Sequence, residues 1–409
     1  IRSCLVGSEM CIRDSFSSDY GMLGALLGLC AFFSIITYEE QQPVGAEGAN
    51  RLLPELENLT VLDKSVVIAG KGGDEGKIFV DSLQALLEER GWQVKKVVKG
   101  GPPELGRGLR DAFARNARVS VLACEQSFVD MPVLENLKKS IPGMRDMQVV
   151  YPRSYKWPNF LKASNLLNVA NQIAVIAIIA IGMTLVIITA GIDLSVGSLI
   201  AFSAVLATWI IREWMGAGDA TALGMFAGCI LAMLACGGLG LFSGTMVAVL
   251  GVPPFVTSLG MMMVASGLAY LLSGGLSIYQ LPTSFDWLGR GDDLLGIPNA
   301  VVLMIILYLL AHLLMSRTVV GRQVYAVGGN PEAARLSGVP VKKILLWVYA
   351  GSGALAGLGG IVMASQFISG DPKYGLMYEL YVIAAVVVGG TSLSAVSYTH
   401  LTLPTIFRV

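Results

Sequence analysis

Long apolar runs separated by short polar segments dominate the chain beyond residue 163. A helix needs about 20 consecutive apolar residues to cross the hydrocarbon core of a bilayer. An earlier run of that length covers Tyr20–Tyr38, and further runs cover Asn171–Ala190, Ser195–Ile211, Thr221–Leu250, Pro254–Leu272, Ala300–Leu314, Ile344–Phe367 and Leu380–Gly390. The pattern therefore predicts an α-helical polytopic membrane protein with about eight spans. The run Thr221–Leu250 is longer than one span needs, and its glycines either break the helix or allow close helix packing.

The stretch between the first two predicted spans has a different pattern. Short apolar segments alternate with segments of helical periodicity, which is typical of a small α/β domain with a parallel sheet. We expect strands at Ser65–Gly70, Trp92–Val98, Arg118–Ala123 and Met147–Pro152, and helices at Phe79–Leu87, Pro103–Arg115 and Val133–Lys139. The predicted organisation is a first transmembrane helix in 16–40, an α/β insert in 41–157 and a helical membrane domain in 158–394.

The polar segment Arg317–Lys343 carries the clearest local signals. Asn330 is suited to cap a helix, Pro331 to its first position and Glu332 to its first turn, while Gly338 is suited to end it in a left-handed conformation. Only about two turns fit between these signals, and so short a helix is not stable alone in water. We therefore expect it to be held by packing, and in a membrane protein a soluble partner is a candidate for that contact.

Composition and charge agree with the membrane assignment. Of 409 residues, 54% are hydrophobic and 14% are charged, against about 25% charged residues in soluble domains. The 29 basic and 29 acidic residues cancel, so no overall field favours nucleic acid as a partner. The six cysteines show no paired spacing typical of a metal site.

The two ends stand apart from this organisation. Residues 1–15 and 395–409 resemble translated sequencing-adapter sequence, so we expect both segments to be artefacts that take no part in the fold. The alternative is a short native tail at each end.

Short loops set the predicted orientation, because the positive-inside rule applies to them and not to long domains. The Arg317–Lys343 loop carries five basic residues and one glutamate, so we place it in the cytoplasm. Counting spans backward then places the Ser277–Asn299 loop and the α/β insert outside, and the N-terminus in the cytoplasm. Arg153, Lys156 and Lys162 argue the other way, although they adjoin the long domain.

Enzyme chemistry finds little support in the residues. The glycine-rich Gly70–Lys77 segment fails as a phosphate-binding loop, because Ile78 follows Gly76-Lys77 where Ser or Thr is required. A turn between strand and helix explains these glycines without a ligand. No Ser, His and Asp set and no metal-ligand cluster stands out, and Cys124 is typical of a buried small residue. We predict no catalytic residue, no metal and no cofactor.

A carboxylate inside the apolar segment Gly182–Ala201 is the other notable polar feature. Asp193 lies between two apolar runs, where an ionised side chain is expensive unless it is paired or hydrogen-bonded. Glycines and serines flank it, which predicts a broken helix whose second half begins near Asp193. The aspartate then either caps a turn or lines a translocation path, a candidate set formed by Gly191, Asp193, Ser195, Gly197 and Ser198. Glu379 similarly opens the last span in an architectural role.

Four motifs in a fixed order resemble the ribose-type permeases of ATP-binding cassette (ABC) transporters, the membrane subunits of bacterial sugar importers. They are GMTLVIITAGIDLSVGS (Gly182–Ser198), GVPPFVTSLGMM (Gly251–Met262), GRQVYAVGGNPEAARLSGV (Gly321–Val339) and YELYVIAAVVVGGTSL (Tyr378–Leu393). The resemblance runs from about Pro158 to Ser394, more than half of the chain. It implies a bacterial cytoplasmic membrane protein that moves a ribose-like monosaccharide and is not itself an enzyme.

The resemblance also implies partners and a coupling element. A second permease copy, two cytoplasmic ATPase subunits and an extracytoplasmic sugar-binding protein complete such an importer. The short helix would be the coupling helix that contacts the ATPase, formed by Asn330, Pro331, Glu332, Ala333, Ala334, Arg335, Leu336, Ser337 and Gly338. A solvated loop whose basic residues only set topology is the weaker alternative, because topology alone does not require capping residues at both ends.

The chain departs from the family pattern at two places. Members continue with more membrane helices after the segment that ends near Leu393, so we expect a C-terminally truncated sequence. Members also join their first two spans by a short loop, so the role of the α/β insert is not implied by the resemblance. Two other functions stay open: a permease for another small polar solute, such as a nucleoside or signalling sugar, and a membrane-anchored sensor that binds ligand through the insert.

Overall fold

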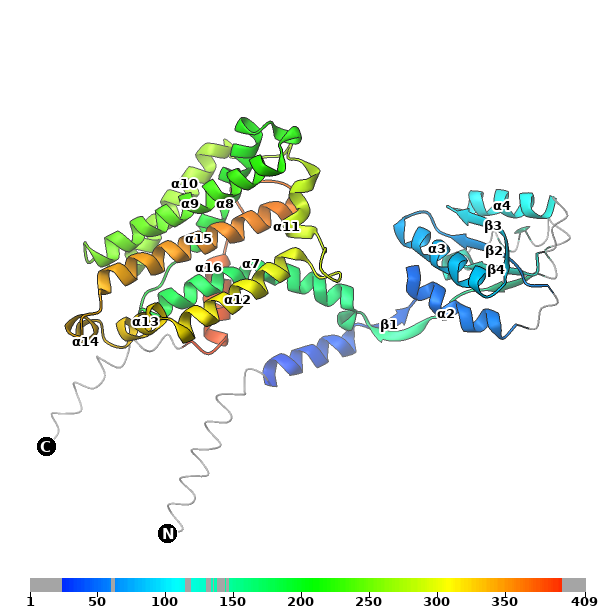
Figure 1. The fold of residues 1–409 in the computed structure, drawn as a ribbon, viewed down its shortest axis with the longest axis horizontal. Coiled ribbons are helices and arrows are strands. Elements are labelled where there is room, and N and C mark those ends of the chain that lie inside the picture. The colour runs from blue at the N-terminus through cyan, green and yellow to red at the C-terminus, as the bar shows by residue number, and fades with distance from the viewer. Residues whose placement is uncertain are drawn as a thin grey trace, which may run out of the picture. The chain divides into compact units, whose positions relative to one another are not determined.

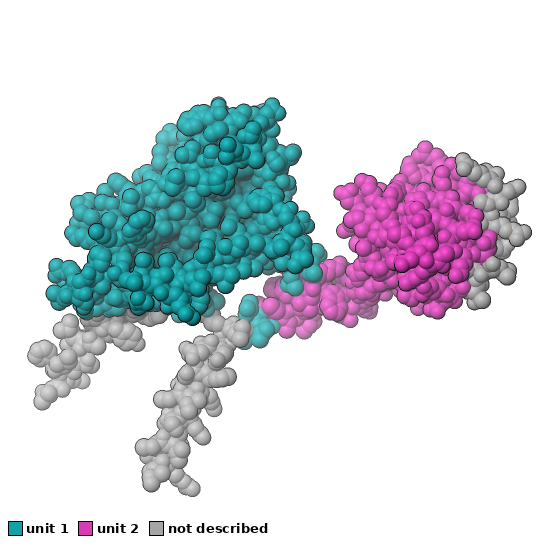
Figure 2. Space-filling view, viewed as in Figure 1, with its two compact units in different colours: residues 1–27, 163–409 teal, residues 28–162 magenta. Residues whose placement is uncertain are grey.

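The computed structural model describes residues 24–59, 63–114, 119–129, 134, 136–137, 144 and 147–391. The chain divides into two compact units, residues 28–162 and residues 1–27 with 163–409 (Figure 2). The segments 1–15 and 395–409, which the sequence suggests are artefacts, lie outside the described residues.

Six described helices are long and apolar enough to cross a membrane. They are α7 (Ala163–Ile188), α8 (Val196–Trp214), α9 (Ala222–Ala248), α10 (Pro254–Ser273), α12 (Asn299–Arg317) and α15 (Val341–Phe367). Two shorter apolar helices cover Gly24–Ile36 and α16, Tyr378–Val388. The chain is thus helical and polytopic, and the predicted count of about eight spans is not confirmed, because two of the eight predicted spans form only these shorter helices.

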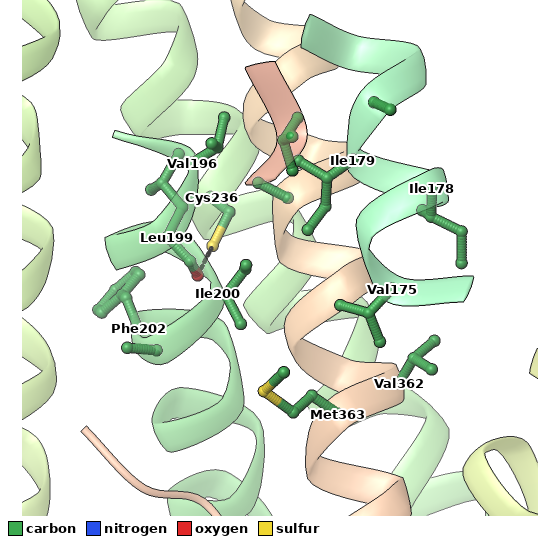
Figure 3. Close-up of a cluster of buried hydrophobic side chains, with 14 of the residues drawn as sticks. Val175, Ile178, Ile179, Val196, Leu199, Ile200, Phe202, Cys236, Val362 and Met363 are labelled. Carbon is green, nitrogen blue, oxygen red and sulfur yellow. Dashed lines mark hydrogen bonds between the residues drawn. The ribbon is translucent and has the colours of Figure 1, made fainter. Parts of the chain in front are cut away.

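Helix α15 lies at the centre of the helical unit and packs against α7, α8 and α9 (Figure 1). The buried side chains between these helices include Ile179 of α7, Leu199 of α8, Cys236 of α9 and Val362 of α15, drawn in Figure 3. The Cys236 thiol lies 3.5 Å from the Leu199 carbonyl oxygen. This apolar core brings together segments that are far apart in sequence.

Glycines allow α9 and α15 to approach closely. Helix α9 runs without a break, so of the two alternatives for its glycines, close packing is the one observed. A Cβ on Gly240 would overlap the Tyr349 carbonyl, and a Cβ on Gly353 would overlap the Cys236 carbonyl. Backbones this close gain dispersion contacts that larger residues would prevent.

Gly353→Ala is therefore expected to destabilise the helical unit by about 1–3 kcal/mol, the usual cost of overpacking. The control is Gly351→Ala on the same helix, where an added Cβ meets no atom within 4 Å. Because alanine favours helix over glycine, this control should be neutral or stabilising. Thermal unfolding of both variants in detergent is the measurement, and equal melting temperatures would contradict the packing argument.

The connections between the long helices include short helical elements. They are η3 (Ala217–Asp219), η4 (Thr283–Asp286), α11 (Trp287–Arg290), α13 (Val319–Gly329) and α14 (Pro331–Leu336). The sequence predicted α14 but not α13. Helix α13 buries Gly321, Val324 and Val327, so it is held by packing at every third residue rather than by a wide apolar stripe.

Residues 28–162 contain a four-stranded parallel sheet in the order β3-β2-β4-β5. The strands are β2 (Ser65–Gly70), β3 (Gln93–Lys99), β4 (Val121–Cys124) and β5 (Gln148–Val150), close to the positions expected from the sequence. Helices α3 (Asp74–Glu89) and α4 (Pro102–Ala114) also match expected helices. The helix expected at 133–139 lies mostly outside the described residues.

Both faces of this sheet are covered by apolar side chains. Along β2, Val66 and Ile68 join one buried cluster, while Val67 and Ala69 join another. The first cluster contains residues of α2 (Gly45–Glu57) and α3, and the second contains residues of α4. Alternation of side chains along a strand produces this three-layer arrangement.

Two features of residues 28–162 escaped the sequence analysis. One is α2, which lies before the predicted start of the α/β pattern and buries Ala49, Leu52 and Leu56. The other is an antiparallel ribbon of β1 (Tyr38–Gln41) and β6 (Tyr155–Pro158). The ribbon strands are only four residues long and largely exposed. The two strands form because segments that are far apart in the sequence pair with each other. A local sequence pattern does not predict such pairing.

Cys124 at the end of β4 is fully buried, as its sequence context suggested. Burial, with a smaller contribution from the neighbouring Glu125 charge, raises the pKa of its thiol from 9.0 to about 12. Because the thiolate is the nucleophile, a rise of this size lowers the reactive fraction near pH 8 by about a thousandfold. We expect iodoacetamide to modify Cys124 about a thousand times more slowly in the folded chain than after unfolding in detergent. Peptide mapping by mass spectrometry measures both rates, and similar rates would contradict a buried thiol.

Candidate functional site

Helix α14 begins as its sequence predicts. The Asn330 side-chain oxygen accepts a hydrogen bond from the Ala333 main-chain N–H at 3.0 Å. Pro331 occupies the first helical position and Glu332 lies in the first turn. The bond satisfies one of the N–H groups that have no partner inside the helix.

The end of α14 is closed by main-chain hydrogen bonds. Gly338 has a φ of +85°, and its N–H donates to the Arg335 carbonyl at 3.0 Å. The Val339 N–H donates to the Ala334 carbonyl, also at 3.0 Å. This pair of bonds around a left-handed residue is a Schellman motif, so Gly338 ends the helix as expected.

One side chain attaches α14 to the rest of the helical unit. Ala334 is 5% exposed and packs in a cluster with residues of α13 and α15. Leu336 is 83% exposed. An exposed leucine alone is ordinary, but here it lies at the end of a capped helix in which Ala334 is the one buried residue. The remaining surface of α14 is free to contact another molecule.

The charged residues of α14 pair with each other. Arg335 donates to the Glu332 carboxylate from Nη2 at 2.9 Å and from Nε at 3.2 Å. Both side chains are largely exposed, so the pair adds at most about 1 kcal/mol to stability. The guanidinium and the carboxylate can therefore exchange this pairing for contacts with a partner at little cost.

The predicted helix break around Asp193 is present. Helix α7 ends at Ile188, and Ala190 has a φ of +62°. The Gly191 N–H donates to the Val186 carbonyl at 2.9 Å. Helix α8 then begins at Val196, so the chain is irregular from Thr189 to Ser195.

Asp193 is 1% exposed, and its carboxylate accepts three hydrogen bonds, two from Ser195 within the break and one from α15. Its Oδ1 accepts from the Ser195 main-chain N–H at 3.0 Å and from the Ser195 hydroxyl at 2.5 Å. Its Oδ2 accepts from the Ser352 hydroxyl of α15 at 3.3 Å. Asp193 therefore stabilises the turn formed by Asp193 to Ser195, just before α8. It does not cap the N–H groups in the first turn of α8 itself.

Two contacts at the break were not expected from the sequence. A Cβ on Gly191 would lie 2.6 Å from the Tyr349 hydroxyl of α15, and that buried hydroxyl has no hydrogen-bond partner among the described residues. A Cβ on Gly197 would overlap the Glu379 carboxylate at the start of α16. Glycine at both positions thus lets α15 and α16 reach the break, and Glu379 lies in the first turn of α16 as predicted.

The other predicted residues of this set have local roles. The Ser198 hydroxyl donates to the Ser195 carbonyl at 2.9 Å. Gly191, Asp193, Ser195 and Gly197 are buried, while Ser198 is partly exposed. The structure thus gathers the set in one place, and its role in a translocation path stays a prediction. Among the described residues, no three His, Cys, Asp or Glu side chains are grouped as metal ligands.

Comparison with known proteins identifies the family of the helical unit. The sequence model of the family described as "Branched-chain amino acid transport system / permease component" matches residues 165–403. The match extends past Ser394 into the segment that the sequence suggests is an artefact. No solved structure matches the chain.

Curated proteins show the same relationship. The ribose import permease of Escherichia coli (strain K12) is 41% identical over 241 residues, which cover 58% of this chain and 72% of the relative. The ribose import permease of Bacillus subtilis (strain 168) is 38% identical over 239 residues, covering 58% and 71%. The L-arabinose ABC transporter permease of Azospirillum brasilense is 36% identical over 237 residues, covering 58% and 67%. The chain therefore belongs to the family of permease components of branched-chain amino acid-type transport systems.

Proposed function

We propose that this chain is the membrane-spanning permease subunit of an ABC importer that moves a sugar across the bacterial cytoplasmic membrane. The observation that carries the proposal is the similarity to ribose and L-arabinose permeases at 36–41% identity. The family model covers the four ordered motifs, including both α14 and the Asp193 break. The substrate class is taken from these relatives, and the capped helix α14 and the Asp193 break support the proposed coupling of transport to energy.

The partners follow from the same family relationship. Two cytoplasmic ATPase subunits would supply ATP hydrolysis, an extracytoplasmic sugar-binding protein would deliver the solute, and a second copy of this chain would complete the pathway. The lipid bilayer surrounds the six long apolar helices, of which α12 and α10 bury only 11% and 22% of their most apolar windows. Such exposed apolar helices fit contact with lipid or with the second copy.

The proposed orientation places α14 in the cytoplasm. Five basic residues against one glutamate in Arg317–Lys343 support this placement. The α/β insert, residues 41–157 in the sequence analysis, would then be extracytoplasmic and the N-terminus cytoplasmic. On this assignment, α14 faces the compartment where ATP is available.

The proposed coupling runs from α14 to the Asp193 break through α15. Helix α15 starts at Val341, so only four residues, Ser337–Pro340, separate it from α14. Ser352 of α15 hydrogen-bonds to Asp193, and Tyr349 of α15 faces Gly191. A displacement of α14 by closing ATPase subunits would move α15 as a rigid body and act on the break between α7 and α8.

Reconstitution tests the proposed transport. The full chain, its ATPase and its binding protein are placed in proteoliposomes with labelled D-ribose and L-arabinose. ATP-dependent accumulation of one of these sugars, absent when the ATPase is omitted, is expected. Accumulation without the ATPase, or ATP-driven uptake of a nucleoside in preference to both sugars, would reject the proposed function or its substrate class.

A further inference from the structure

A crevice in residues 28–162 lies where open parallel sheets usually bind ligands. The chain passes from β2 to β3 on one side and returns to place β4 on the other, so the strand order reverses between β2 and β4. In open α/β sheets, the crevice beyond the carboxyl ends of the two strands at such a point is the preferred ligand site. Here the loop Lys71–Gly73 leaves the end of β2, and Glu125 leads from the end of β4 into the short helix α5 (Gln126–Val129).

A cavity of about 370 Å³ occupies this position, within the range of about 300–1,000 Å³ that is usual for small-molecule pockets. Its walls are the loop after β2, Glu125 with the start of α5, the first turn of α3, and Gln42, Pro43 and Val44. The polar groups therefore come from the strand ends, while the proline and valine supply a small apolar wall.

Two neighbouring residues in the wall, Glu125 and Gln126, each carry a buried hydrogen-bond acceptor. Glu125 is 6% exposed, and its Oε2 accepts from the Lys71 main-chain N–H at 3.0 Å. No lysine or arginine among the described residues forms an ion pair with it. The adjacent Gln126 Oε1 is buried and has no hydrogen-bond partner among the described residues. Buried acceptors without partners are costly, so this wall is suited to receive donors from a ligand.

The charges of the crevice select against anions. Asp74, Glu75 and Glu125 line it against a single cation, Lys71, and Asp74 forms an exposed ion pair with Lys77. A phosphate or nucleotide would meet net negative charge, in agreement with the missing phosphate-loop residues in the sequence. The main-chain N–H groups of Gly72 and Gly73 donate to no described residue, so the crevice also offers donors.

Hydroxyl groups fit this combination, because each one both donates and accepts a hydrogen bond. An ammonium ligand would satisfy the acceptors but could not use the N–H groups. We propose that the crevice between β2 and β4 binds a small neutral polyhydroxylated molecule of monosaccharide size. Its hydroxyls donate to Glu125 and Gln126 and accept from the glycine loop. This second binding site lies outside the membrane helices and is independent of which solute crosses the membrane.

The test measures equilibrium binding to the full chain in lipid nanodiscs by isothermal titration calorimetry. D-ribose and D-glucose are the neutral probes, inorganic phosphate is the anionic probe and putrescine is the cationic probe. Saturable binding of at least one of the two sugars, tighter than binding of phosphate or putrescine, is expected.

Two variants assign that binding to the crevice. Glu125→Gln removes the charge but keeps an acceptor, and Gln126→Leu removes an acceptor that has no partner, so neither is expected to lower the melting temperature. Each is expected to weaken sugar binding at least about tenfold. The matched control is Glu88→Gln at the far end of α3, where the exposed carboxylate contacts Gln84, and binding should not change.

Three results would overturn the proposal. Absence of saturable sugar binding to the folded chain, tighter binding of phosphate or putrescine, or unchanged affinity in both crevice variants would each reject the proposal.

Discussion

Combining Arg335→Glu with Leu336→Asp is expected to reduce co-purification of the ATPase subunit at least about a hundredfold, the effect of losing one to two interface hot spots. Leu336 is the large exposed apolar side chain of α14, and among the described residues Arg335 forms a surface ion pair with Glu332 alone. If α14 enters a cleft of the ATPase, the new carboxylates would be buried there without partners, which is strongly unfavourable. Co-purification from detergent extracts measures the association.

The matched control is Leu295→Asp. Leu295 is 91% exposed and lies in the Ser277–Asn299 loop, which we predict to be outside, so this variant also replaces an exposed leucine by a carboxylate. It should leave ATPase association unchanged. The α14 variant should still reach the membrane in normal amount, because only Ala334 of that helix is buried. Normal association of the ATPase with the α14 variant would contradict the docking role.

Asp193→Ala is expected to lower the free energy of unfolding by about 2–4 kcal/mol, since it removes hydrogen bonds to a buried carboxylate and leaves buried donors without an acceptor. Those donors are the Ser195 N–H, the Ser195 hydroxyl and the Ser352 hydroxyl. Loss of transport is expected even in molecules that remain folded, because α15 would no longer be tied to the break. Unfolding by detergent titration and uptake by proteoliposomes measure the two effects.

Asp193→Asn and Ser198→Ala serve as controls for this prediction. Asparagine keeps an acceptor oxygen and the shape of the side chain, so most of the stability should return. Ser198 makes only a local bond to the Ser195 carbonyl, and its loss should cost less than about 1.5 kcal/mol. An Asp193→Ala variant as stable and as active as the native chain would show that the carboxylate does not hold the break.

Signals that depend on neighbouring residues could be predicted from the sequence. The caps of α14 are such signals, because Asn330 bonds to a residue three positions away and Gly338 closes the helix over the preceding turn. The break at Asp193 was visible for the same reason, since Gly191 and Ser195 lie within two residues of it. The long apolar helices could be predicted because each one is a continuous run of apolar residues in the sequence.

Contacts between distant segments could not be predicted in this way. Ser352 contacts Asp193 across 159 residues of sequence, and Glu379 reaches Gly197 only because α16 starts beside α8. In the sequence, Tyr349 looks like an ordinary residue of an apolar helix, although in the structure its hydroxyl faces the break. These residues are placed by helix packing, so a single sequence carries no local mark of their role.

Residues 28–162 show the same difference between features that local sequence predicts and features that depend on distant contacts. Strands β2 to β5 follow from short apolar segments, whereas α2 and the β1–β6 ribbon depend on tertiary contacts. The glycines of Gly70–Lys77 were best explained as a turn, and the fold does use them so, since a Cβ on Gly76 would overlap the Lys71 carbonyl. The crevice beside that turn became visible only when the strand order was known.

Site-specific photocrosslinking tests the central claim, that this permease is driven by a separate ATPase subunit seated on α14. A photoreactive amino acid replaces Leu336 in one variant of the full chain and Leu295 in another, and each is irradiated in membranes that contain the ATPase and the binding protein. The account predicts a crosslink from position 336 to the ATPase and none from position 295. A crosslink to the ATPase from position 295, or none from position 336 in a complex that still transports, would contradict it.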